Sequence, residues 1–191
     1  MNCCSTTGIL DIFSFLVALF TLFVTIYIPE KIKWEQTYSS LISDYRSYDF
    51  AVAFQSIVEF LKTECENNFE VVQKKYEEHY KNEIEKGASV IEPCKSLHYQ
   101  RRLLTQFYWQ LDLCARSFFI GKSRIRRDFT TGEANMLKFL YCMNQAIDNS
   151  KVLYKDISSD DLIPSPEHSN GINKYLSHIF KILKKSKRWI K

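Results

Sequence analysis

An apolar run near the N-terminus constrains this chain more than any other feature. Residues 9–28 read ILDIFSFLVALFTLFVTIYI, and about twenty residues of helix cross a hydrocarbon layer of about 30 Å. The one charged residue, Asp11, lies at the start of the run, where its carboxylate can reach the lipid head groups. The side chains of Thr21 and Thr25 can return their hydroxyl hydrogen bonds to the helix backbone. Residues 9–28 are therefore predicted to form a transmembrane helix.

Three other interpretations of this run fit the sequence less well. A cleaved signal peptide has a basic start and a small-residue cleavage site, whereas MNCCSTTG carries no Lys or Arg and no A-x-A follows the run. A lipoprotein signal places its cysteine after the apolar run, but Cys3 and Cys4 precede it. A buried core helix is normally shorter or carries a polar face.

The charges on either side of the run predict its orientation. No basic side chain precedes it, while Lys31 and Lys33 follow it directly. Cytoplasmic flanks of membrane helices carry an excess of Lys and Arg. We therefore expect a single-pass protein of the inner or plasma membrane, with residues 1–8 outside and the larger C-terminal part in the cytoplasm.

The rest of the chain has the periodicity of helices. Pro29 allows the membrane helix to stop or kink. After it, apolar residues recur every three or four positions, and no alternation typical of strands is long enough to support a sheet. This pattern predicts an all-α fold with helices at about 34–45, 49–61, 67–86, 95–120, 131–149 and 172–189.

The helix at 95–120 is the longest of these and is predicted to be central. Its residues Leu97, Leu104, Phe107, Leu111, Cys114 and Phe118 keep a near-heptad spacing, which is typical of a helical bundle. We expect an antiparallel helical bundle over residues 29–155. Residues 156–171, which are acidic and rich in Ser and Pro, are expected to link it to a basic amphipathic helix and tail at 172–191.

The C-terminal segment is the most uneven in charge. From residue 170 onward the chain has seven basic side chains and no acidic ones, although the whole chain carries a net charge of only +4. A basic amphipathic helix ending in Trp suits an anionic membrane surface. A bundle helix with a solvated lysine face and a nucleic-acid contact are the alternatives. The residues of the expected membrane-surface contact are Lys174, Lys181, Lys184, Lys185, Lys187, Arg188, Trp189 and Lys191.

A second basic cluster lies around the end of the central helix. Aromatic residues lie among its charges, and basic and aromatic groups together can bind single-stranded nucleic acid. These side chains can instead pair with the acidic segment 59–85, or bind an acidic protein or lipid. We take them as a candidate partner-binding patch, whose residues are Arg101, Arg102, Arg116, Lys122, Arg124, Arg126 and Arg127.

The six cysteines and four histidines do not form a recognisable catalytic or metal site. The cysteines lack a disulfide pattern, so in a cytosolic domain they are expected to be free thiols that pack as small apolar residues. Cys94 and His98 are four positions apart, which is half of a metal site at most. We expect no metal and no cofactor.

Motifs of the helical enzyme classes are also missing from the sequence. No Arg precedes a histidine at the spacing of the helical ribonucleases, and no adjacent His and Asp suit a metal phosphohydrolase. There is no glycine-rich phosphate loop and no G-x-S-x-G. We therefore expect a protein that is not an enzyme.

Three short segments resemble a bacterial family of unknown function. They are Lys33-Trp34-Glu35, the turn Asp44-Tyr45-Arg46-Ser47, and the part of the central helix from Phe107 to Phe118. Members of that family carry an N-terminal single-pass helix and a small helical cytoplasmic domain. The resemblance covers residues 9 to about 149 and implies this architecture, without an activity or functional residues to carry over.

These features favour a membrane-tethered cytoplasmic module that binds a protein partner or anionic lipid. Tethering raises the local concentration of a domain near membrane partners. The first alternative is a self-associating effector that perturbs membranes, in bacterial defence or stress response, for which a homo-oligomer would be expected. The second is a nucleic-acid-binding adaptor, which predicts strongly salt-dependent binding.

Overall fold

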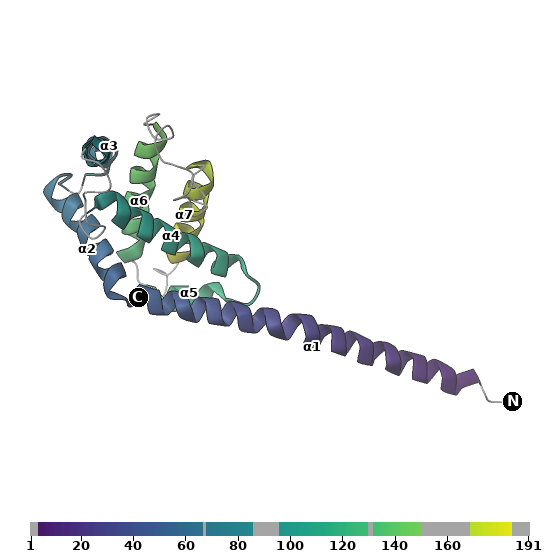
Figure 1. Ribbon diagram of the computed structural model, residues 1–191. Coiled ribbons are helices and arrows are strands. Elements are labelled where there is room, and N and C mark those ends of the chain that lie inside the picture. Colours follow the sequence, from purple (N-terminus) through teal and green to yellow (C-terminus); the bar gives the residue numbers. More distant parts are fainter. Residues whose placement is uncertain (1–3, 67, 86–95, 130–131, 150–168, 185–191) are drawn as a thin grey trace, which may run out of the picture.

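The computed structural model describes residues 4–66, 68–85, 96–129, 132–149 and 169–184. In these residues the chain forms seven helices and no strand, as the apolar spacing predicts (Figure 1). The helices are α1 (Cys4–Tyr45), α2 (Tyr48–Thr63), α3 (Phe69–Glu85), α4 (Leu97–Arg116), α5 (Lys122–Asp128), α6 (Gly132–Asn149) and α7 (Ser169–Lys184).

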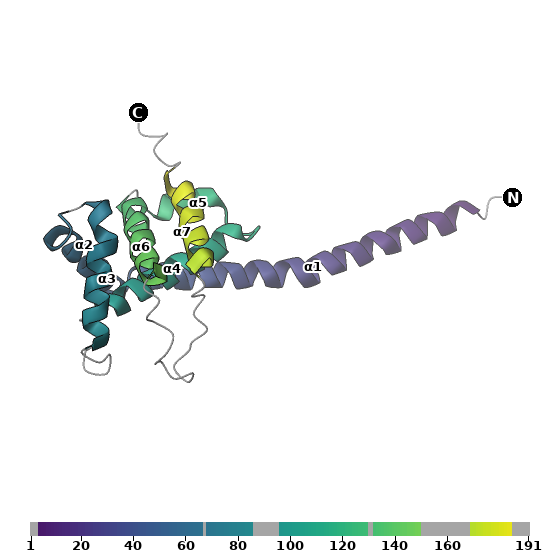
Figure 2. The same cartoon turned by 90° about the horizontal axis from the view of Figure 1, so that it is seen from above.

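The long helix α1 has two halves with different surroundings. Its N-terminal half projects away from the other helices, and its C-terminal half lies along them (Figures 1 and 2). No residue from 11 to 37 is buried, whereas Tyr38 and Leu41 are 1% and 2% exposed. α1 is long and apolar enough to span a membrane.

The expectation that α1 stops or kinks at Pro29 and that a separate helix covers 34–45 was wrong about the stop. The helix continues through Pro29 to Tyr45. A proline removes one backbone hydrogen bond from a helix. Beyond Pro29, Trp34, Tyr38 and Tyr45 recur at helical spacing and pack against the core. This packing stabilises the helix after the proline.

Side-chain caps fix the starts of three helices. The Ser47 hydroxyl accepts the backbone N–H of Phe50 at the start of α2, at 3.2 Å. Asn68 Oδ1 accepts the Glu70 N–H at the start of α3, and the Ser96 hydroxyl accepts the Tyr99 N–H at the start of α4. Such caps satisfy backbone donors that have no partner within the helix.

Helix α4 is the centre of the packing, as the near-heptad spacing predicts. It contacts α1, α2, α6 and α7, while α3 and α7 pack on α6. Leu104, Leu111 and Cys114 on α4 have no exposed surface. The apolar residues of six helices thus meet around one central helix, and the core includes α7 (Figure 2).

The C-terminal end of α4 differs from the prediction. The helix ends at Arg116 rather than at 120, because Ser117 has extended backbone angles and its backbone N–H caps the last turn. Phe118, which was expected on the core stripe, is 88% exposed. The basic stretch that follows lies outside the predicted helices, and it forms the short helix α5.

Candidate functional site

The loop between α4 and α5 lies against α1 at the end of its apolar run. The ring of Phe119 contacts that of Tyr27, with centroids 5.1 Å apart. Phe118 projects from the same loop and is the most exposed large apolar residue in the described part of the chain. We call residues 117–120 the phenylalanine loop, and its contact with Tyr27 defines the side of the domain that faces the bare half of α1.

Polar contacts join α5 to the packed half of α1. The Tyr38 hydroxyl donates to Asp128 Oδ2 at 2.9 Å. Arg124 forms an ion pair with Glu35, and its guanidinium lies 4.8 Å from the centroid of the Tyr38 ring. Arg127 pairs with Asp128. The contacts of Tyr38 and Arg124 fix α5, and the phenylalanine loop before it, relative to α1.

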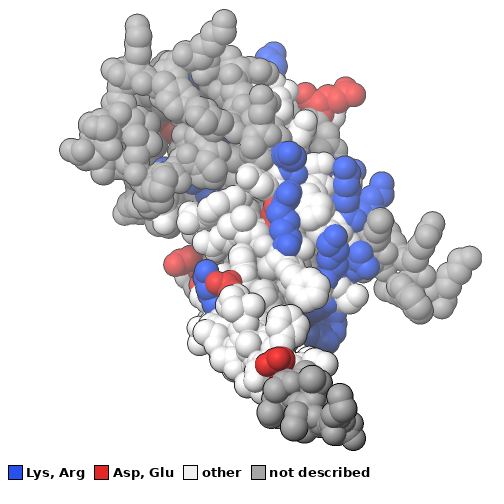
Figure 3. Space-filling view, turned by 90° about the vertical axis from the view of Figure 1, so that its right-hand side faces the viewer, with Lys and Arg blue, Asp and Glu red and all other residues white. Residues whose placement is uncertain are grey.

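Seen from the side towards which α1 projects, the molecule carries Lys and Arg side chains gathered beside uncharged residues (Figure 3). Lys31 and Lys33 lie on α1 directly beyond the apolar run, and Lys122 begins α5; all three are exposed. Arg126 Nε donates to the backbone carbonyl of Ile182 at 3.0 Å, which brings the C-terminal end of α7 against α5.

The seven residues of the predicted partner-binding patch have different surroundings. Five of its seven members make intramolecular contacts: Arg101 is buried, Arg126 contacts α7, and Arg116, Arg124 and Arg127 are in ion pairs. The carboxylates in these pairs lie outside the acidic segment 59–85 that was considered as their partner. Lys122 lies beside the phenylalanine loop, and Arg102 lies elsewhere on α4.

Arg102 lines a hollow of about 450 Å³ between the α1–α2 turn and α4. Its walls carry both charges and rings, including Asp44, Asp49, Phe50 and Tyr99. The hollow is near the C-terminal end of α1, and residue 44 follows residue 28 by a helical rise of about 24 Å. It therefore lies far along α1 from the phenylalanine loop.

Only part of the expected membrane-surface contact falls on described residues. Lys174, Lys181 and Lys184 are exposed on α7, while 185–191 lie outside the described part, as do Cys94 and residues 156–168 of the expected linker. The apolar face of α7 packs on α4 and α6. The buried residues of this face are Leu176, Ile179, Ile182 and Leu183.

A buried carboxylate joins α7 to α4. Asp112 has no exposed surface, and its two oxygens contact Arg116 Nε and His178 Nδ1, each at 2.5 Å. The Arg116 guanidinium also lies 5.4 Å from the centroid of the Tyr175 ring on α7. A buried charge needs partners, so this contact fixes the register of α7 on α4.

Sequence reasoning missed that Asp112 belongs to a row of buried polar side chains. Arg101, Thr105, Tyr108 and Asp112 follow at spacings of four, three and four, so they share one face of α4, and each is at most 6% exposed. The Arg101 guanidinium donates to Asn144 on α6. The same heptad counting that found the apolar stripe could have found this row.

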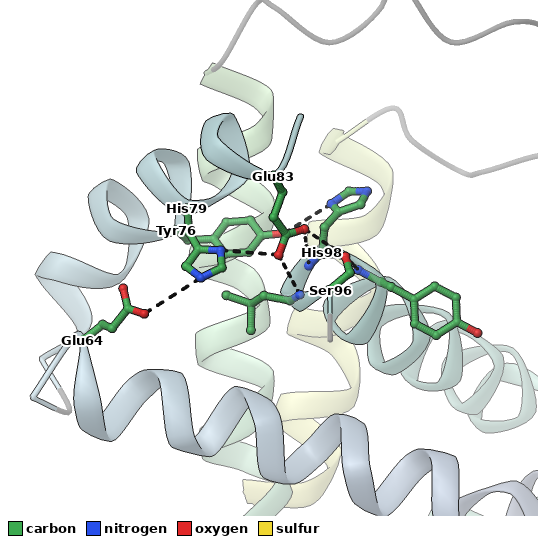
Figure 4. Close-up of polar contacts among 8 residues, drawn as sticks. Glu64, Tyr76, His79, Glu83, Ser96 and His98 are labelled. Atoms are coloured by element: carbon green, nitrogen blue, oxygen red, sulfur yellow. Dashed lines mark hydrogen bonds and ion pairs between the residues drawn. The ribbon is translucent and has the colours of Figure 1, made fainter. Parts of the chain in front are cut away.

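A second polar cluster closes the start of α4 against α3 (Figure 4). Glu83 accepts hydrogen bonds from the Ser96 hydroxyl at 2.9 Å and from the Leu97 N–H at 2.8 Å. Burial alone would raise the pKa of Glu83, but hydrogen bonds from His79, Ser96 and Leu97 lower it below its ordinary value. An ionised carboxylate at a helix N-terminus stabilises the helix.

His98 lies beside this carboxylate and is mostly buried. Burial and the nearby charge of Arg101 lower the pKa of His98 to about 3, although Glu83 opposes them. The Tyr76 hydroxyl lies 3.3 Å from His98 Nδ1, and burial raises the pKa of Tyr76 to about 12. These groups are therefore neutral near pH 7, which suits an internal contact between α3 and α4.

The thiols and carboxylates of the described residues are arranged as packing and pairing groups. Cys65 and Cys114 are buried, and burial raises the pKa of each thiol to about 11. Across the described ranges, no three His, Cys, Asp or Glu side chains lie together as metal ligands would.

Comparison with known proteins adds no relative. No family model matches the chain, and the searches of curated proteins and of solved structures gave no match. The resemblance to a bacterial family of single-pass proteins stays a prediction.

Proposed function

We propose that this protein is a membrane-tethered interaction module whose helical domain is held at the cytoplasmic face of the membrane, where it binds anionic lipid or a protein partner. α1 is the tether, and the other helices form the bundle that it carries. The phenylalanine loop and the exposed lysines beside it face the lipid.

The bare half of α1 is the observation that carries this proposal. Ile12, Phe13 and Phe20 each keep about two thirds of their surface exposed, and the surrounding residues are equally apolar on every side of the helix. Soluble monomers do not expose continuous apolar surface of this extent. Lipid hydrocarbon is the environment that satisfies a helix which is apolar all round.

Charge supports the proposed orientation. Lys31 and Lys33 are exposed directly beyond the apolar run, where the positive-inside tendency places the cytoplasm. The basic surface of the domain lies on the same side, and cytoplasmic leaflets carry anionic lipid. A domain with this orientation meets the leaflet with the sign of charge that attracts it.

The hollow beside Arg102 supports the protein-binding part of the proposal. It combines acidic, basic and aromatic side chains in one concave surface, and interfaces are rich in aromatic residues and Arg. Because it lies far along α1 from the apolar run, a partner could occupy it while the opposite side of the domain rests on lipid.

Membrane extraction and topology reporters test the proposal on the full chain. We expect the protein to stay in the membrane pellet after alkaline carbonate washing. A fluorescent reporter that matures only in the cytoplasm should be active when fused to the C-terminus, and a reporter that acts only after export should be inactive there. Release by carbonate would overturn the tether, and export of the C-terminal reporter would overturn the orientation.

A further inference from the structure

The phenylalanine loop is a rigid projection rather than a slack connection. The Ser117 hydroxyl donates to the Cys114 carbonyl at 2.7 Å and accepts the Ile120 N–H at 3.2 Å. Ile120 is 2% exposed and Phe119 rests on Tyr27. The loop is thus held at both ends, and Phe118 between them is presented outward.

The height of Phe118 along α1 is fixed by its neighbour. Tyr27 is the last residue but one of the apolar run, and aromatic rings at such positions favour the boundary between hydrocarbon and head groups. Since Phe119 touches Tyr27, the adjacent Phe118 lies at the same level. An exposed phenylalanine at this level has hydrocarbon within reach.

Cations surround this projection, and the nearby acids are already paired. Glu30 pairs with Lys33 at 3.6 Å, and Glu35 pairs with Arg124. Lys31 is exposed one helical turn beyond Tyr27, and Lys122 is exposed two residues after the loop. With these acids paired, the exposed Lys31 and Lys122 leave an excess of positive charge near the loop. Lys and Arg side chains gather on the side of the molecule towards which α1 projects (Figure 3).

We propose that the phenylalanine loop is a lipid-docking wedge: Phe118 inserts at the hydrocarbon boundary of an anionic leaflet, and Lys31 and Lys122 bind the lipid phosphates beside it. This inference rests on the proposed tether and deepens it, because it adds a second contact that sets the tilt of the domain. An apolar wedge flanked by lysines is matched by lipid, which offers hydrocarbon and negative charge at one boundary.

Photo-cross-linking in the full-length protein tests this wedge. Phe118 is replaced by p-benzoylphenylalanine, and the protein is reconstituted into vesicles of phosphatidylcholine with or without phosphatidylglycerol. Tyr48 is the matched control position, because it is 81% exposed and starts α2 at the other end of α1. We expect lipid adducts at position 118 to exceed those at position 48 by about tenfold in the anionic vesicles.

The lysines are tested in the same assay. Charge reversal of Lys122 in the Lys122→Glu variant should lower the adduct yield at position 118 by at least about fivefold in anionic vesicles, because one cation near such a surface contributes about that factor. In phosphatidylcholine alone the variant and the parent should give equal yields.

The outcomes separate this inference from the proposed function. Equal lipid yields at positions 118 and 48, equal yields in the two lipid mixtures, or adducts from position 118 to a second protein copy would each overturn the wedge. Carbonate washing of the same vesicles reports on α1 alone. Retention of the protein with no lipid adduct at position 118 would leave the tether standing and reject the wedge.

Discussion

The bare half of α1 and helix α7 are both rich in apolar residues, yet they have opposite surroundings. No residue from 11 to 28 is buried, whereas Ile179 and Leu183 on α7 are 0% and 1% exposed. α7 is apolar on one side only, with its exposed lysines on the other, so a protein core can satisfy it. The first half of α1 is apolar on every side, and no neighbouring helix covers it. A helix that is apolar on one side can be covered by a protein core, whereas a helix that is apolar on every side is expected to lie in lipid.

Charges placed in the bare half of α1 should have the largest effect on this comparison. The double variant Leu16→Arg and Phe20→Arg adds two charges near the middle of the run, at about 2.5–3.5 kcal/mol each. We expect the protein to leave the carbonate-resistant membrane fraction almost completely. Its helical content by circular dichroism should remain, because neither side chain is part of the core.

The Leu16→Ala and Phe20→Ala double variant is the control, and it should stay in the membrane. If the arginine variant stayed in the membrane fraction to the same extent as this control, the bare half of α1 would not be held by lipid. The different surroundings of α1 and α7 would then not correspond to lipid for one helix and a protein core for the other.

A cavity in the face of α7 should give the next largest effect. The Ile179→Ala variant removes a side chain with no exposed surface, and such deletions cost about 2–4 kcal/mol. Unfolding of the full-length protein in detergent by a chemical denaturant should show this loss, while carbonate resistance stays unchanged. The exposed control Lys181→Ala should change the free energy of unfolding by less than about 0.5 kcal/mol.

An opposite result would move α7 to the lipid side of the comparison. If Ile179→Ala left the unfolding transition where it was and instead weakened attachment to anionic vesicles, the apolar face of α7 would be acting as a membrane contact. That was the expectation for the basic segment from its sequence alone.

The sequence predicted most of the helices, but it divided α1 at Pro29, missed the short helix α5 and misplaced the end of α4. Apolar spacing predicted the all-helical fold and the central position of α4. The prediction failed at Phe118, because counting heptads extends a predicted helix whether or not the backbone stays helical. Ser117 ends α4 through its backbone angles and its hydroxyl hydrogen bonds, and spacing of apolar residues carries no information on either.

The candidate site was harder to predict because it is built from distant residues. The phenylalanine loop is positioned by its contact with Tyr27, which is distant in the sequence. Several arginines of the predicted basic patch form intramolecular ion pairs, such as Arg124 with Glu35. His178 had no recognisable neighbour in the sequence, yet it contacts Asp112, which is 66 positions away. A local pattern lists the charges, and only the packing decides which of them stay available to a partner.

Mild acid should lower the free energy of unfolding of the helical domain and leave membrane attachment unchanged. The pKa of His98 is lowered from 6.5 to about 3, so the native state binds fewer protons than the unfolded state between these values. The free energy of unfolding therefore has its full value above pH 6.5, and it falls by up to about 1.4 kcal/mol per pH unit below pH 6.5. Glu83, whose pKa is also lowered from 4.5, adds to the loss only below that value.

Denaturant unfolding at a series of pH values measures how the free energy of unfolding changes with pH. The His98→Gln variant removes the group that contributes most to this change. We expect the variant to lose less stability than the parent between pH 6.5 and 4.5, the window in which His98 titrates in the unfolded state and Glu83 contributes little. Carbonate-resistant attachment after exposure to the same acid should be unchanged, because the bare half of α1 carries no His and only one charged side chain, Asp11, at its start. If the free energy of unfolding of the parent protein did not depend on pH, or if the variant showed the same dependence, His98 would accept its proton in the folded state. The contact between α3 and α4 would then be open to water.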